Sequence, residues 1–150
     1  MNRYLIVACV MLAATPASAD WEFTKWGMTP AQVMAGSSGM VSAMPKDEVK
    51  RDDADHWEIS LRGDIKANGK VRPASFMFDT TSGGLRCVIY NGLGSDAGVL
   101  KQELVKKYGD GKQETFGDLQ SIDWVAPDEI SLMYNEKGRS AAVMHCRPGG

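Results

Sequence analysis

The stretch that decides the fold is residues 57–90, which read WEISLRGDIKANGKVRPASFMFDTTSGGLRCVIY. Apolar and polar residues alternate here, as in half-buried strands. The first predicted strand places four apolar side chains on one face: Trp57, Ile59, Leu61 and Ile65. Asn68 and Gly69 then favour a two-residue hairpin turn, and the returning strand carries Phe76 and Phe78 on one face. A further turn and a third alternating strand follow, so this stretch predicts an antiparallel meander.

Upstream of the meander, Thr29 and Pro30 mark a helix start. Thr29 is suited to the N-cap and Pro30 to the first helical position, where its missing N–H costs nothing. Gln32 completes a capping box, and Met28 and Val33 flank the turn as a hydrophobic staple. The small residues that follow predict a helix of about two turns.

A second helix is predicted over residues 95–109, capped by Ser95 or Asp96 and ended by Gly109. Apolar side chains at a spacing of four residues form the face that we expect to pack on the sheet. These side chains are Leu100, Leu104 and Tyr108.

The remaining segments predict short strands and loops. The charged stretch 46–55 favours an exposed loop, whereas residues 40–44 favour a short strand. Four further strands are expected near residues 113–116, 121–125, 130–134 and 140–146. The order is a helix then strands, twice over. We therefore predict an α+β fold: an antiparallel sheet with helices on one face, built by tandem duplication of a helix-plus-meander unit.

The first nineteen residues have the pattern of a secretory signal peptide. Arg3 precedes an apolar run, and Ala17 and Ala19 form a small-x-small cleavage site before Asp20. We expect residues 1–19 to be removed, and residues 20–150 to form a single α+β domain in the periplasm or outside the cell. A lipoprotein cleavage box ending at Cys9 is the alternative, although only eight residues precede that cysteine.

Charge and hydropathy exclude several classes of partner. The formal net charge is −2, and loss of the signal peptide makes it one unit more negative. This weak balance argues against nucleic acid and anionic membrane surfaces. Beyond the signal peptide no apolar run has the length of a membrane span, so we expect no membrane anchor.

Two cysteines remain after cleavage, Cys87 and Cys146. In an oxidising compartment, two cysteines most simply form one disulfide, and we predict this pairing. Free or intermolecular thiols are the alternative, as is a metal site that pairs Cys87 with His145.

No motif predicts a catalytic, cofactor or metal site. Residues 92–97 fit G-x-G-x-x-A, but the flanking strands form hairpins rather than the βαβ unit of dinucleotide-binding folds. The acidic residues of 52–55 with His56 have no EF-hand spacing. Neither G-x-S-x-G nor S-x-x-K is present. We therefore expect no cofactor and no enzymatic activity.

Residues 26–33, Trp-Gly-Met-Thr-Pro-Ala-Gln-Val, resemble the G-M-T-x-x-x-V opening of a group of bacterial envelope proteins. This group includes the β-lactamase inhibitor proteins and the small lipoprotein of the outer-membrane β-barrel assembly machine. The resemblance implies one or two helix-plus-antiparallel-sheet units and a role as a binding module. The assembly lipoprotein carries its lipid on a cysteine, whereas the mature chain here is expected to begin at Asp20.

Together these patterns favour an exported, non-enzymatic module that binds another envelope protein through its open sheet face or its loops. Trp21 and Trp26, near the mature N-terminus, are candidates for partner contact, although they could instead pack the terminus onto the sheet. A small envelope hydrolase and a small-ligand carrier are the alternatives.

Overall fold

The structure is a computed structural model that describes residues 23–149, apart from 68, 94–96, 136 and 138–139. The predicted signal peptide and Trp21 lie outside this range. The described residues form two helices and nine strands. In chain order these are α1 (Pro30–Gly36), β1 (Val41–Ala43), β2 (Lys50–Asp52), β3 (Trp57–Ala67), β4 (Lys70–Asp79), β5 (Leu85–Leu93), α2 (Ala97–Tyr108), β6 (Lys112–Phe116), β7 (Leu119–Trp124), β8 (Glu129–Asn135) and β9 (Ser140–Cys146).

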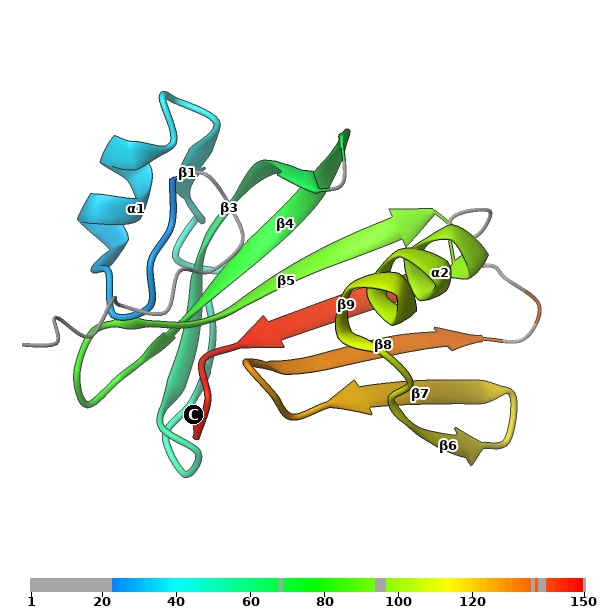
Figure 1. The fold of residues 1–150 in the computed structure, drawn as a ribbon. Coiled ribbons are helices and arrows are strands. Elements are labelled where there is room, and N and C mark those ends of the chain that lie inside the picture. Colours follow the sequence, from blue (N-terminus) through cyan, green and yellow to red (C-terminus); the bar gives the residue numbers. More distant parts are fainter. Residues whose placement is uncertain (1–22, 68, 94–96, 136, 138–139, 150) are drawn as a thin grey trace, which may run out of the picture.

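All nine strands form one antiparallel sheet with the order β1-β3-β4-β5-β9-β8-β7-β6, in which β2 also pairs with β3 (Figure 1). The last strand of each meander lies at the centre, where β5 pairs with β9. The α+β class and the antiparallel sheet are therefore confirmed. Neither helix in the described range is long and apolar enough to cross a membrane.

Helix α1 begins as its sequence predicts. The Gln32 N–H donates to the Thr29 hydroxyl at 3.4 Å, and the Thr29 N–H donates to the Gln32 side chain at 2.8 Å. This reciprocal pair is the capping box. Val33 is fully buried in the main core, and Met28 packs against that core.

Helix α2 buries the expected face. Leu100 and Leu104 belong to the main core, and the half-buried Tyr108 packs against it. Gly109 adopts a φ of 81° and donates its N–H to the Val105 carbonyl at 2.8 Å, as expected of a C′ glycine. The predicted caps, Ser95 and Asp96, lie outside the described residues.

Buried apolar side chains fall into two clusters. The main core draws on both helices and on seven strands, including Phe76 of β4, Val88 of β5 and Val143 of β9. The smaller cluster consists of Met77, Cys87 and Cys146, and its partly buried neighbours are Trp57, Ile59, Ile89 and Met144. Since successive side chains of a strand point to opposite faces, the two clusters occupy opposite faces of the sheet.

One prediction for β3 is wrong. Trp57 and Ile59 were expected to share a face with Leu61 and Ile65, but the register between β3 and β4 shifts between Ile59 and Leu61. Such a bulge adds one residue and reverses the side-chain alternation beyond it. Trp57 and Ile59 therefore join the smaller cluster, while Leu61 and Ile65 join the main core.

The expected loop over residues 46–55 contains a short strand. Residues Lys50–Asp52 of β2 pair with the start of β3. Charged side chains do not prevent pairing at the outside of a sheet, because the strand is held by backbone hydrogen bonds while its side chains remain in water.

Candidate functional site: the disulfide face of the sheet

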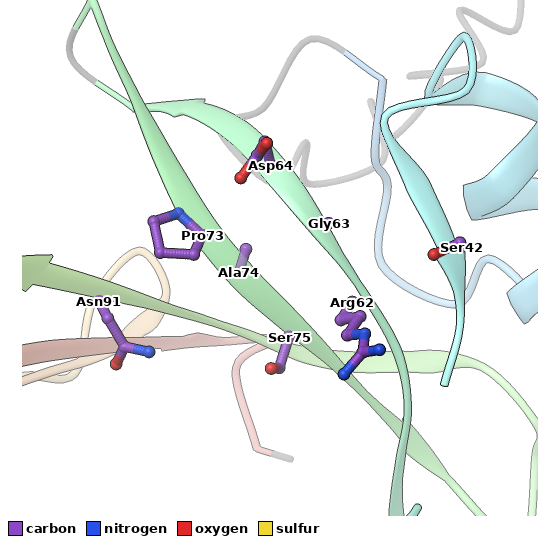
Figure 2. Close-up of a pocket in the computed structure, with 8 residues that line it drawn as sticks. All are labelled: Ser42, Arg62, Gly63, Asp64, Pro73, Ala74, Ser75 and Asn91. Atoms are coloured by element: carbon purple, nitrogen blue, oxygen red, sulfur yellow. The ribbon is translucent and has the colours of Figure 1, made fainter. Parts of the chain in front are cut away.

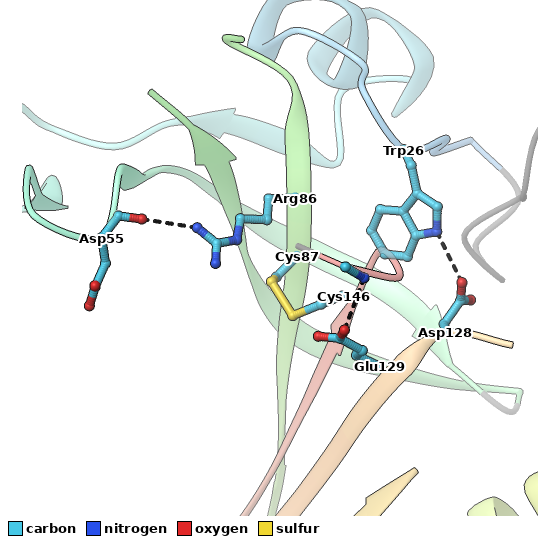
Figure 3. Close-up of a disulfide and its surroundings, with 8 residues drawn as sticks. Trp26, Asp55, Arg86, Cys87, Asp128, Glu129 and Cys146 are labelled. Carbon is cyan, nitrogen blue, oxygen red and sulfur yellow. Dashed lines mark hydrogen bonds between the residues drawn. A yellow bond between two sulfur atoms is a disulfide. The ribbon is translucent and has the colours of Figure 1, made fainter. Parts of the chain in front are cut away.

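A disulfide lies at the centre of the sheet. Cys87 of β5 and Cys146 of β9 are directly opposite partners, with their Cα atoms 4.1 Å apart and their sulfur atoms 2.13 Å apart. The cysteines are thus at disulfide distance, as the sequence predicts. They form the covalent connection between the strands that end the two halves of the sheet (Figure 3).

We use the name disulfide face for the face of the sheet that carries Cys87 and Cys146. Its remaining members follow from strand register, because directly opposed residues share a face. Across β9 and β8 the face continues through Met144, Ser131 and Met133. Across β7 and β6 it continues through Asp123, Ser121, Leu119, Lys112, Glu114 and Phe116.

Large apolar side chains are exposed on this face. Phe116 is 61% exposed, Leu119 42% and Met133 38%. Leu119 is the direct partner of Phe116, and Met133 is opposite Ser121 on the neighbouring strand. Isolated exposed apolar residues are ordinary, but neighbours on one face form a contiguous contact area.

Described residues line several hollows on the disulfide face. One, of about 430 Å³, lies beside the disulfide and is lined by Asp55, Trp57, Met77, Arg86, Cys87, Glu129, Met144 and Cys146. A second, of about 270 Å³, adjoins it towards β7 and is lined by Asp123, Trp124, Val125, Glu129, Ile130, Ser131, Met144 and Cys146.

A third hollow, of about 400 Å³, lies on the first half of the sheet (Figure 2). Its lining is mostly polar: Ser42, Arg62, Gly63, Asp64, Pro73, Ala74, Ser75 and Asn91. The Arg62 guanidinium pairs with the Glu48 carboxylate. The disulfide face is therefore polar at this hollow, while its exposed large apolar side chains lie at the other end of the sheet, near the β6–β7 turn and on β8.

Hydrogen bonds connect the loops and strand ends that surround the disulfide. Arg86 donates to the Asp55 carbonyl at 3.0 Å, and the Gly149 N–H donates to the Glu129 carboxylate at 2.9 Å (Figure 3). On the same face, the Asp123 carboxylate accepts hydrogen bonds from the hydroxyls of Ser121 at 3.3 Å and Ser131 at 2.5 Å. These contacts hold polar groups in defined positions around the apolar residues.

The turn between β4 and β5 is organised by Asp79. Its carboxylate accepts from the Ser82 N–H at 2.7 Å, the Ser82 hydroxyl at 2.9 Å and the Thr81 N–H at 3.0 Å. The hydrogen bonds from Ser82 are the largest cause that lowers the pKa of Asp79 below its ordinary value of 3.8, and Thr81 and the nearby Arg147 add to it.

We expect Asp79 to titrate below pH 3.8 in an NMR titration of the carboxyl groups. Because the pKa is lower in the folded state, this group stabilises the fold above pH 3.8 and loses its contribution as pH falls through the folded pKa. Ser82→Ala, which removes the hydroxyl and keeps the N–H, should move the midpoint part of the way back. A wild-type midpoint at or above 3.8 would contradict this assignment of hydrogen bonds.

On the opposite face, a buried polar cluster joins the N-terminal segment to the last strand. Asp128 accepts from the Trp26 indole N–H at 3.3 Å and lies 2.8 Å from Nε2 of His145. The ring of His145 meets those of Trp26 and Tyr108 edge-on, with centroids 5.6 and 6.4 Å away. His145 is 3% exposed and Asp128 is also buried.

The sequence did not indicate the pairing of Asp128 with His145. The two residues are seventeen positions apart, and they meet because Ile130, two residues after Asp128, is the register partner of His145. The sequence does not specify the register between β8 and β9, and this register brings the two side chains together. Trp26 is half-buried and packs on the main core, so its contact with a partner stays a prediction.

The other residues considered for chemistry are dispersed. His56 is exposed in a turn with a φ of 54°. Asp53 pairs with Arg51, while Asp52 accepts from the Ala54 and Asp55 N–H groups. In the part of the chain that the structure describes, no group of three or more His, Cys, Asp or Glu side chains could hold a metal ion.

Residues 94–96 of the glycine-rich stretch lie outside the described range, so the loop at which a dinucleotide phosphate would bind is not placed. Cys87 lies at bonding distance from Cys146, which removes it as a metal ligand for His145. Comparison with protein-family models, with curated proteins and with solved structures finds no match for this chain.

Proposed function

We propose that this protein is an exported, non-enzymatic binding module of the bacterial envelope, and that its disulfide face contacts another envelope protein. The observation that carries the proposal is the group of exposed apolar side chains on that face, Phe116, Leu119 and Met133. On the same face, nearer the disulfide, Met144 and Ile89 are only partly buried. Contiguous exposed apolar residues of this kind mark interaction sites on soluble proteins.

We further propose that both helices pack on the face opposite the disulfide. In support, Val33 of α1 and Leu100 of α2 belong to the same core as Phe76 and Val143. By strand alternation, the side chains of Phe76 and Val143 lie on the face of the sheet opposite the cysteines. An antiparallel sheet covered on one side leaves its other side to water or to a partner. This arrangement would free the whole disulfide face for contact.

A tandem duplication would account for the sheet order. Each half runs a helix and then an antiparallel meander, and the meanders meet through their last strands, β5 and β9. In this proposal β1, β3, β4 and β5 correspond to β6, β7, β8 and β9, while β2 is an addition in the first half. The proposal is compatible with the resemblance of residues 26–33 to envelope binding proteins that use one or two such units.

The geometry favours the alternatives less. For a hydrolase, the pair of His145 and Asp128 has the hydrogen bond expected of a general base and its orienting carboxylate. Both residues are buried, however, and Trp26 and Tyr108 lie against the imidazole, so a substrate has no direct access. For a ligand carrier, the described hollows lie on the sheet surface rather than in the core.

Site-specific photo-crosslinking tests the proposed docking face. A photoreactive amino acid is placed at Leu119 or Met133 on the disulfide face, and at Val99 of α2 as a control of equal exposure to Met133. After irradiation in envelope extracts of the producing organism, we expect discrete cross-linked species from positions 119 and 133 but not from 99. Mass spectrometry then identifies the partner.

Competition by unlabelled wild-type protein should remove these species, whereas competition by a Leu119→Asp, Met133→Asp variant should not. The apolar contact is lost in that variant, but both positions are exposed, so the fold should be retained, as circular dichroism can check. Equal labelling from positions 99, 119 and 133 would argue against this docking face.

A further inference from the structure

Strand β6 provides an open edge of the sheet. It is the last strand in the order, and among the described residues no strand pairs with its outer side. The opposite edge is interrupted, because β3 is flanked there by two strands of three residues, β1 and β2, with Pro45 between them. Edge strands present unpaired backbone groups, and short, interrupted edges are a common protection against pairing. The β6 edge has five continuous residues, Lys112–Phe116.

The hairpin with β7 determines which backbone groups of β6 face outward. Phe116 and Leu119 are partners across the two residues Gly117 and Asp118. In a two-residue hairpin the partners that flank the turn exchange hydrogen bonds, and such pairs alternate along the ladder. The N–H and C=O groups of Gln113 and Thr115 therefore point away from β7, towards a potential new strand.

Charges on β6 favour one self-pairing register. Lys112 and Glu114 lie on the disulfide face, and their side chains form an ion pair at 2.6 Å. We propose that two copies of the chain pair antiparallel through β6, with Gln113 opposite Gln113 on a two-fold axis. This register uses the outward backbone groups of Gln113 and places Lys112 of each copy opposite Glu114 of the other.

The other antiparallel registers are less favourable. Centring the pair on Glu114 places two carboxylates directly opposite each other, which is destabilising. Centring it on Thr115 places Glu114 opposite the apolar Phe116. In the chosen register Gly111 lies opposite Thr115, whose outward groups extend the ladder. A lysine on an edge strand normally protects that edge against pairing. In this register the charge of Lys112 is instead compensated by Glu114 of the second copy.

Analytical ultracentrifugation tests this pairing. We expect the mature protein to shift from monomer towards dimer as its concentration rises from about 10 μM to about 1 mM at low salt. Lys112→Glu should weaken dimerisation about tenfold or more, because two cross-copy attractions become repulsions. Glu114→Lys should have the same effect. The double variant with both changes restores opposite charges across the pair and should recover dimerisation.

The two single variants change the net charge in opposite directions, so a weaker dimer in both cannot come from net charge. Recovery in the charge-swapped variant then identifies the register that places residue 112 opposite residue 114. Gln113→Pro, which removes the outward N–H of each copy at the two-fold axis and so both hydrogen bonds there, should give a monomer. A protein that stays monomeric throughout the range, or a dimer unaffected by these charge changes, would overturn the proposal. The cross-linking contacts at Leu119 and Met133 do not depend on this pairing, so the two proposals can fail separately.

Discussion

We expect the double variant Cys87→Ala, Cys146→Ala to lose about 4 kcal/mol of unfolding free energy. The bond closes a loop between residues separated by 59 positions, so its removal restores a large conformational freedom to the unfolded chain. Alanine is the suitable replacement, because both cysteines are buried and a serine hydroxyl would require a new partner.

The position of the bond adds to this expectation. It joins β5 to β9, where the two halves of the sheet meet, and it forms the smaller apolar cluster together with Met77; Ile89 and Met144 pack against that cluster. Replacing the two sulfur atoms by hydrogen reduces the buried apolar volume of that cluster. Loosening here would affect the contact between the halves before it affected either meander.

Urea denaturation followed by circular dichroism measures the loss. Wild-type protein treated with a reductant provides the control, because it removes the bond without changing the chain. The single variants should resemble the double variant, since one cysteine alone cannot form the bond. A loss below about 1 kcal/mol would mean that the bond contributes little to the fold.

Features that depend on neighbouring residues could be predicted from the sequence. The Thr29 capping box, the Gly109 helix end and the face formed by Leu100 and Leu104 follow from spacings within one or two turns. The four strands after α2 were also expected, with ends within two residues of those observed. Each of these arises from local geometry and needs no knowledge of what the chain packs against.

Features that depend on strand register or on the order of strands in the sheet could not be predicted. The bulge beyond Ile59 reversed the faces of β3, although its apolar spacing was regular. The contact of Asp128 with His145 depends on how β8 aligns with β9, and the open edge at β6 depends on the order of the whole sheet. A sequence sets the alternation within each strand, while register and order come from the folded sheet.

The buried cluster around Asp128 gives the second large expected effect. We expect Asp128→Ala to lower the free energy of unfolding by about 3 kcal/mol, because it deprives two side chains of a hydrogen-bond partner at a cost of about 1–3 kcal/mol each. Those side chains are the Trp26 indole and the His145 imidazole. Neither can turn to water readily, since His145 is buried and Trp26 packs on the core.

Trp26→Phe separates the two contributions. It keeps an aromatic ring against His145 but removes the hydrogen bond to Asp128, so we expect a loss of about 1 kcal/mol from the bond, together with a smaller loss of ring contact. Thermal and urea denaturation of both variants give the comparison. If Asp128→Ala were within about 0.5 kcal/mol of wild type, the cluster would not hold the N-terminal segment.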